Sequence, residues 1–223
     1  AGESRRFGEG VAILVGDLSH VYADQLLHGA PHAAWQVWNE MRIELNVGQY
    51  LDMLGSATSE RSREKAERVC RYKSAKYTIE RPLHLGAVLA DPDRATELMA
   101  AFSAYGLPLG DAFQMRDDVL GAFGDTATTG KPVGDDLREG KPTPLMAIAT
   151  EHANASQLQV LQLVGHVQLS DAQVADVQRV IRETGAFDQL EADISNKTDE
   201  AIAVIQQAPI TDVARDELIA LAA

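Results

Sequence analysis

The sequence is short of cysteine, aromatic residues and positive charge. Cys70 is the only cysteine of the 223 residues, which fits a reducing compartment and predicts a cytoplasmic protein without an intrachain disulfide. Lysine and arginine number 20 against 33 acidic residues, and the resulting formal net charge of −13 argues against nucleic acid as a partner. No apolar stretch approaches the roughly 20 residues that span a bilayer, so we expect no transmembrane segment.

Helical periodicity is what the sequence does contain. Apolar residues make up 45% of the chain, enough for a substantial core, and they recur at helical spacing, as at Trp35, Trp38, Met41 and Leu45. No alternating pattern typical of a strand is present. We therefore predict an all-α, single-domain helical bundle. Its expected parts are helices at 9–29, 33–54, 60–79, 83–90 and 92–123, a loop at 124–142, and four or five helices in 143–222.

Several residues are expected to interrupt this pattern. Pro82 predicts a break or a kink, because proline cannot donate the helical hydrogen bond. Gly106, Pro108 and Gly110 interrupt the pattern of the long segment 92–123. The first residues, AGESRRFGEG, include no initiator methionine and predict no helix before about Gly10.

Two adjacent carboxylates, Asp117 and Asp118, lie in an otherwise apolar helical stretch. Gln114, three and four residues earlier, shares their face of the helix. Buried like charges are costly unless a cation such as Mg²⁺ neutralises them. The Gly-rich stretch that follows brings Lys131 and Lys141 towards the same end, so the residues suit a metal–polyphosphate complex. A solvated helix end with a polar loop is the alternative, and the residue types alone leave both open.

A resemblance to a known family favours the first interpretation. FQMRDDVLGAFGD at 113–125, with GKPVGDDLREGK at 130–141, resembles the second aspartate-rich motif of the trans-polyprenyl diphosphate synthases. Three more segments resemble the family's in the family's order: GDL at 16–18, GQYLDM at 48–53 and YKSAKYT at 72–78, where Ser74 replaces the usual threonine. ERPLHLG at 80–86 is similar to actinobacterial long-chain synthases. The chain is thus identified as a member of this farnesyl and geranylgeranyl diphosphate synthase-like family.

The resemblance implies a Mg²⁺-dependent, all-α transferase of isoprenoid biosynthesis, with an isoprenoid synthase type of bundle. It condenses isopentenyl diphosphate with an allylic diphosphate. Asp117 and Asp118 are then implied metal ligands, with Asp117 also catalytic. Lys73, Lys131 and Lys141 are implied to bind the allylic diphosphate, Lys73 and Lys131 as catalytic residues.

Supporting roles follow from the same resemblance. Gln114 is implied to help bind the diphosphate, while Gln49, Asp52 and Asp135 are implied to support the groups that do so. The family often has a third aspartate at the position of Gly121. This chain therefore carries a two-carboxylate version of the second motif.

The family's other half-site, a DDxxD motif on an earlier helix, does not occur in the sequence. We expect residues 1–223 to be the C-terminal portion of one isoprenoid synthase domain, incomplete at its N-terminus and inactive alone. Cleavage, a fragment, or natural absence of the motif would each explain this. A non-catalytic subunit of a heteromeric synthase is the alternative function, and a plain helical interaction module is a third.

The family also implies a homodimer. The amphipathic segments 9–29 and 92–123 are the candidate faces for it. Product chain length is not predictable, because the residues that set it in the family precede the segments present here.

Overall fold

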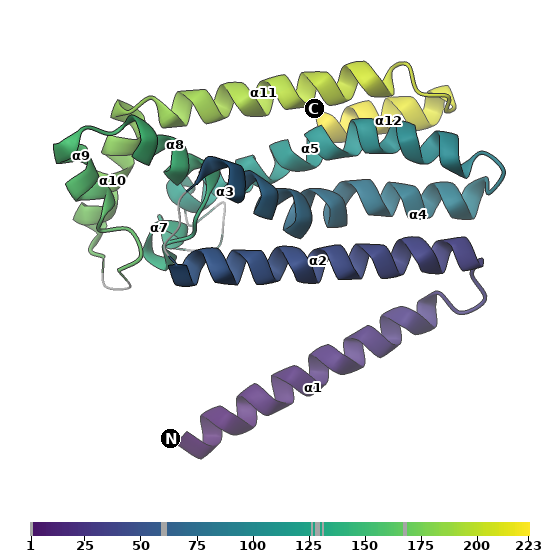
Figure 1. Ribbon diagram of the computed structural model, residues 1–223, viewed down its shortest axis with the longest axis horizontal. Coiled ribbons are helices and arrows are strands. Elements are labelled where there is room, and N and C mark those ends of the chain that lie inside the picture. The colour runs from purple at the N-terminus through teal and green to yellow at the C-terminus, as the bar shows by residue number, and fades with distance from the viewer. Residues whose placement is uncertain (1, 59–61, 126, 128–129, 131, 167–168) are drawn as a thin grey trace.

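The computed structural model describes the whole chain except residues 1, 59–61, 126, 128–129, 131 and 167–168 (Figure 1). Helix is the only regular structure among the described residues, which confirms the all-α prediction. The elements, in chain order, are α1 (Gly2–Leu26), α2 (His32–Thr58), α3 (Arg63–Cys70), the π-helix η1 (Arg71–Glu80), α4 (Arg81–Ala90), α5 (Ala95–Phe123), α7 (Asp135–Glu139), α8 (Pro144–His152), α9 (Ala155–Leu161), α10 (Asp171–Glu183), α11 (Ala186–Ile205) and α12 (Asp212–Ala222).

The long helices form the body of the molecule. The continuous segment η1–α4 packs between α2 and α5, and α11 packs along the other side of α5 (Figure 1). The short helices α7 to α10 gather at one end, where α5 finishes. This end is where residues from α2, η1, α5 and the α7–α8 connection meet.

The apolar core is divided into two clusters. The larger one joins the second half of α5 to α7, α8, α10 and the start of α11, and its side chains include the fully buried Met115, Leu145, Ile148, Ile181 and Leu190. The smaller one joins the first half of α5 to the end of α11 and to α12. Burial of each such side chain contributes about 1.5–3 kcal/mol, so the two clusters hold α5 firmly along its length.

Helix α1 diverges from this body (Figure 1). It is tied to α2 near the turn, where Trp38 Nε1 donates to Asp24 Oδ1 at 2.9 Å and Arg42 pairs with Asp24 at 3.0 Å. Many of its large apolar side chains, among them Phe7 and Leu14, are exposed. No helix of the described part of the chain is long and apolar enough to cross a membrane.

Two glycines let η1 approach its neighbours backbone to backbone. A Cβ on Gly110 of α5 would lie 2.5 Å from Cα of Ala75, and one on Gly48 of α2 would overlap the backbone of Lys73. Any larger residue at either position would push η1 away. The segment that carries Lys73 is therefore held between α2 and α5 with no side chain separating the backbones.

The helix boundaries differ from expectation in two places. Helix α1 begins at Gly2, so the prediction of no helix before about Gly10 was wrong. The stretch 124–142 was predicted to be loop throughout, but it contains α7. Gly134 and Gly140 bracket this helix with φ of +70° and +72°, a conformation that glycine adopts without strain and that lets five residues coil between two turns.

The expected interruptions do not divide the helices. Pro82 is the second residue of α4, and η1 runs directly into α4, so the proline does not interrupt the helical path. Helix α5 is continuous through Pro108 because both of its faces are packed, with Gly106 and Gly110 against η1. In the C-terminal part, Asn154 and Ser170 are the N-caps of α9 and α10, each with a capping box.

Substitution of Gly110 by alanine tests this close contact. The new Cβ should force η1 and α5 apart and lower the free energy of unfolding by about 1–3 kcal/mol. Gly86→Ala is the matched control, because Gly86 is also helical but has no atom within 4 Å of an added Cβ. It should raise stability by up to about 1 kcal/mol. Urea unfolding of both variants would reveal equal effects if the backbone contact did not matter.

Candidate functional site

A polar cavity of about 140 Å³ lies where α2, α3, η1, α5, α7 and the residues that follow α7 converge. It brings together most of the residues singled out in the sequence. The predicted site residues that line it are Asp52, Lys73, Gln114, Asp117, Asp118 and Lys141. These residues come from separate helices and loops, so they meet only in the folded protein.

Asp118 is the most buried carboxylate of this cavity. Gln114 Nε2 donates to Asp118 Oδ1 at 3.1 Å, whereas the buried Oδ2 has no hydrogen-bond partner. Burial raises the pKa of Asp118 to about 8, and the nearby negative charges of Asp136 and Asp117 add to the increase. A buried carboxyl oxygen without a partner at a polar cavity is suited to bind a cation, which would remove the cost of its charge.

The described residues fit Mg²⁺ rather than a metal enclosed by protein ligands. Among them, no three His, Cys, Asp or Glu side chains converge closely enough to hold a metal on their own. Mg²⁺ is commonly bound through one or two carboxylates, with waters and substrate phosphates completing its shell. Asp117, exposed at the cavity, and the buried Asp118 provide such a pair, and Gln114 links them by a second contact of 3.4 Å to Asp117 Oδ2.

Two lysines reach the same cavity, each held by a carboxylate. Lys73 Nζ donates to Asp52 Oδ2 at 2.6 Å. Lys141 pairs with Asp136 and, at 3.4 Å, with Glu139. Burial alone would lower the pKa of Lys141, but its hydrogen bond to Asp136 and the adjacent negative charges raise it above the usual value. The ammonium group of Lys141 therefore remains charged at neutral pH, and both lysines are held in position by their carboxylate partners.

Two of the predicted residues that the structure describes, Gln49 and Asp135, do not line the cavity. Gln49 is exposed on α2, and Asp135 is half-buried at the start of α7. Lys131 lies outside the described residues. The functional roles of all the residues inferred from the sequence remain predictions.

Asp136 is a cavity residue that the sequence reasoning missed. It is 6% exposed, lines the cavity and pairs with Lys141. A Cβ on Gly121 would overlap its carboxylate, so the glycine that replaces the family's third aspartate leaves room for Asp136. The adjacent acidic residues Asp135 and Asp136 were the feature of the sequence that could have indicated a further cavity carboxylate. Only the orientation of α7 decides which of the two faces inward.

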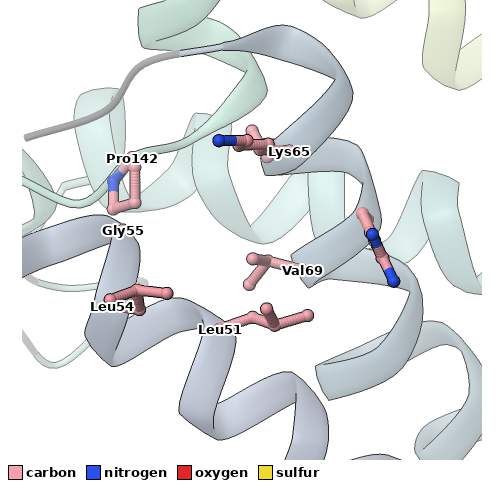
Figure 2. Close-up of a pocket in the computed structure, with 8 residues that line it drawn as sticks. Leu51, Leu54, Gly55, Lys65, Val69 and Pro142 are labelled. Atoms are coloured by element: carbon pink, nitrogen blue, oxygen red, sulfur yellow. The ribbon is translucent and has the colours of Figure 1, made fainter. Parts of the chain in front are cut away.

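An apolar pocket of about 180 Å³ adjoins the polar cavity (Figure 2). Leu51 and Leu54 of α2 face Val69 of α3 across it, with Pro142 at one side. Ala66, Val69 and Pro142 line both spaces. The carboxylates thus have an apolar wall, which contributes to the desolvation that raises the pKa of Asp118.

Comparison with known proteins identifies the family of this chain. The model of the polyprenyl synthetase family matches residues 3–200. This chain belongs to the polyprenyl synthetase family. It is 31% identical over 224 residues to geranylfarnesyl diphosphate synthase of Aeropyrum pernix, across 96% of the chain and 69% of that enzyme. It is 36% identical over 156 residues to geranylgeranyl diphosphate synthase of Mycobacterium tuberculosis, across 67% of the chain and 44% of that enzyme.

A solved family member has the same fold. The geranylgeranyl pyrophosphate synthase of Corynebacterium glutamicum, complexed with isoprenyl diphosphate and magnesium, superposes with a TM-score of 0.90 at 39% identity. The match covers 97% of this chain and 63% of that one. This chain therefore spans between about two fifths and two thirds of the length of these relatives. The similarity confirms the family, the fold and the actinobacterial resemblance of the sequence.

The raised pKa of Asp118 predicts how stability depends on pH. The unfolded chain releases this proton near pH 3.8 but the folded protein retains it up to about pH 8, so a rise in pH across that window destabilises the metal-free protein. Asp118→Asn should therefore raise the melting temperature at pH 8 by at least about 2–4 °C, the shift that each 1 kcal/mol produces in a domain of this size. The difference should shrink towards pH 4.

Thermal unfolding with and without Mg²⁺ checks this prediction. Mg²⁺ should stabilise the wild-type protein more at pH 8 than at pH 6, because binding requires the ionised carboxyl, and should stabilise Asp118→Asn little. Asp93→Asn, at an exposed position of the α4–α5 connection, is the control. A Mg²⁺ effect that is equal in both variants would contradict the assignment.

A second prediction separates Asp136 from Asp135. Asp136→Asn should release Lys141 and raise the concentration of magnesium diphosphate needed for half-maximal thermal stabilisation by about tenfold, which equals about 1.4 kcal/mol. Asp135→Asn should change it by less than about twofold, because its side chain does not line the cavity. The assignment is wrong if the two substitutions have the same effect.

Proposed function

We propose that the full-length protein is a polyprenyl diphosphate synthase, which condenses isopentenyl diphosphate with an allylic diphosphate to form a trans-polyprenyl diphosphate. The observation that supports this most is the convergence of Asp117, Asp118, Lys73 and Lys141 on one cavity. The chain belongs to a family whose relatives are named as such synthases, and one of them is described with isoprenyl diphosphate and magnesium.

Asp117 and Asp118 would hold Mg²⁺ at the cavity. Once bound there, Mg²⁺ supplies the Lewis-acid charge that favours departure of the diphosphate from the allylic carbon. Gln114 contacts both carboxylates, at 3.4 and 3.1 Å, and so fixes their separation before any ligand arrives. Little reorganisation is then needed when the metal binds.

The lysines would bind the diphosphate oxygens. Lys73 and Lys141 are oriented by Asp52 and Asp136, which leaves each ammonium group with further donors for phosphate. Lys131, a third predicted ligand, precedes the same α7 segment in the sequence. Charge that develops on the leaving diphosphate is thereby met by fixed positive groups.

The carbon–carbon bond would form within an apolar space. Loss of diphosphate leaves an allylic cation, which the double bond of isopentenyl diphosphate attacks, and loss of a proton completes the new trans double bond. Water must be excluded during this step, because it would capture the cation. The cavity that holds the carboxylates already has an apolar wall in Ala66, Val69 and Pro142, which it shares with the neighbouring apolar pocket.

The 223 residues do not include a DDxxD motif, the other set of carboxylates that this mechanism uses. The proposed activity therefore concerns the full-length protein. Absence of the motif from the full-length protein as well would favour the alternative function, a non-catalytic subunit of a heteromeric synthase. The presence or absence of a DDxxD motif in the full-length protein distinguishes the two.

We further propose a cytoplasmic homodimer. The exposed apolar side chains of α1 support its role as a dimer face, because burial in a second copy would remove them from water. Helix α5, the other candidate, is packed between η1 and α11 and has less surface available. The single cysteine supports a cytoplasmic location.

Substitution of Asp117 tests the proposed activity. Asp117→Ala in the full-length protein should lower Mg²⁺-dependent release of diphosphate by about a hundredfold or more, since an electrostatic stabiliser of the leaving group is lost. Asp93→Ala should retain wild-type turnover. Both should keep the wild-type melting temperature within a few degrees. Undiminished turnover of Asp117→Ala would refute the assignment of the site.

A further inference from the structure

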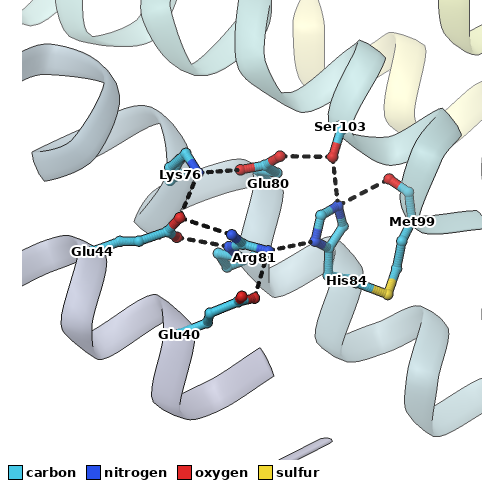
Figure 3. Close-up of polar contacts among 8 residues, drawn as sticks. All are labelled: Glu40, Glu44, Lys76, Glu80, Arg81, His84, Met99 and Ser103. Carbon is cyan, nitrogen blue, oxygen red and sulfur yellow. Dashed lines mark hydrogen bonds and ion pairs between the residues drawn. The ribbon is translucent and has the colours of Figure 1, made fainter. Parts of the chain in front are cut away.

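Glu44 of α2 anchors the end of η1 opposite to Lys73 (Figure 3). Its Oε1 accepts hydrogen bonds from Lys76 Nζ at 2.5 Å and from Arg81 Nη2 at 2.8 Å, and its Oε2 accepts one from Arg81 Nε at 2.7 Å. Its side chain is only 15% exposed. Burial favours its neutral form, but the bonds from Arg81 and Lys76 outweigh burial and lower the pKa of Glu44. The carboxylate is therefore a fixed negative charge.

The partners of Glu44 are themselves held by α4 and α5. His84 Nε2 lies 3.0 Å from the carbonyl oxygen of Met99, and His84 Nδ1 lies 3.2 Å from Arg81 Nη1. Arg81 can only donate and a carbonyl can only accept, so His84 is neutral with its proton on Nε2. Ser103 Oγ donates to Glu80 Oε1 at 2.6 Å. Arg81 thus presents its guanidinium to Glu44 in one orientation.

One face of α2 contacts η1 at three evenly spaced points. Glu44, Gly48 and Asp52 are four residues apart, which places them on successive turns of the same face. Glu44 binds Lys76 in the middle of η1, Gly48 meets the backbone of Lys73, and Asp52 binds the Lys73 ammonium group. The two ion pairs flank the close backbone contact.

The helix η1, which this face of α2 contacts, is a π-helix. A π-helix is uncommon, less favourable than an α-helix and frequent at functional sites. Because it is less favourable, contacts from the surrounding helices must maintain it here. If the segment returned to α-helical winding, the position of Lys73 relative to Arg81 would change. Glu44 holds both Lys76, inside the π-helix, and Arg81, the residue after it, and so fixes the winding between them.

We propose that Glu44 is a positioning residue for Lys73: by binding Lys76 and Arg81 together, it sets the register of η1 that delivers the Lys73 ammonium group to the diphosphate cavity. This inference rests on the proposed function, in which Lys73 binds the allylic diphosphate. Glu44 does not line the cavity and has no contact with substrate in this role. Its effect is transmitted through η1.

Glu44→Gln in the full-length protein is the decisive variant. It preserves the size of the side chain and removes its charge. The KM for the allylic diphosphate should rise by about tenfold, because a displaced binding group weakens ligand contacts, whereas the KM for isopentenyl diphosphate should change by less than about twofold. Glu40→Gln is the matched control. Glu40 lies on the same helix and pairs with the same Arg81 at 3.2 Å, but its side chain is 61% exposed, so both KM values should stay near those of the wild type.

A milder variant keeps the proposal testable if Glu44→Gln folds poorly. Lys76→Met retains the Arg81–Glu44 pair and should shift the allylic KM in the same direction by a smaller factor. Either variant could have a lower melting temperature without the larger rise of the allylic KM relative to the KM for isopentenyl diphosphate. That result would show that Glu44 is only structural and would overturn the proposal.

The wild-type protein separates this inference from the proposed function. If it turns over substrate and Glu44→Gln leaves the allylic KM unchanged, the inference alone fails. If it does not turn over, the proposed function fails, and calorimetry with Mg²⁺ and inorganic diphosphate then tests the inference. Weaker binding by Glu44→Gln than by Glu40→Gln supports it. Equal binding, or no binding by the wild type, overturns it.

Discussion

The contact of η1 with α2 and α5, backbone against backbone, is the constraint on which the rest of the site depends. At Gly48 and Gly110 there is no room for a Cβ, so the distance between these helices is set by main-chain atoms. Main-chain atoms cannot change rotamer, and a π-helix locked in this way presents Lys73 with little freedom. The carboxylates of α5 and the lysine of η1 therefore occupy a fixed relative position because two residues lack side chains.

This arrangement leaves a buried carboxyl group at the cavity without a full set of hydrogen-bond partners. Asp118 has a buried oxygen with no hydrogen-bond partner and a pKa raised to about 8, mainly by burial. In a region with only a structural role such a group would be replaced by an apolar residue, since an unsatisfied buried carboxyl destabilises the fold. The surrounding core, including Met115 and Val119 on the same helix, is well buried and can sustain that cost. Packing along the rest of α5 thus offsets the cost of the unsatisfied carboxyl group.

Residues adjacent in sequence were predictable, whereas contacts between distant segments were not. The helical period indicated the all-α fold, and the motifs at 113–125 and 72–78 identified Asp117, Asp118 and Lys73 as cavity residues. Asp136 was missed because the choice between it and Asp135 depends on how α7 packs. Glu44 was missed for a similar reason: an acidic residue on an amphipathic helix is ordinarily a solvated one, and only the packing of η1 and α4 buries it. Periodicity shows which face of a helix is apolar, but it does not show which neighbour that face meets.

The pairing of each lysine with an aspartate has a consequence for how ligands enter. Among the described residues that line the cavity, four carboxyl groups accompany two lysines, so the cavity is negative even with Asp118 protonated and repels a bare diphosphate. Magnesium reverses the sign of that interaction, and by thermodynamic reciprocity diphosphate must raise the affinity for magnesium by the same factor. Occupancy by either ligand is then strongly cooperative with the other. A cavity of this kind would admit the metal cation alone but would accept diphosphate only when the metal accompanies it, so free anions would not occupy the site.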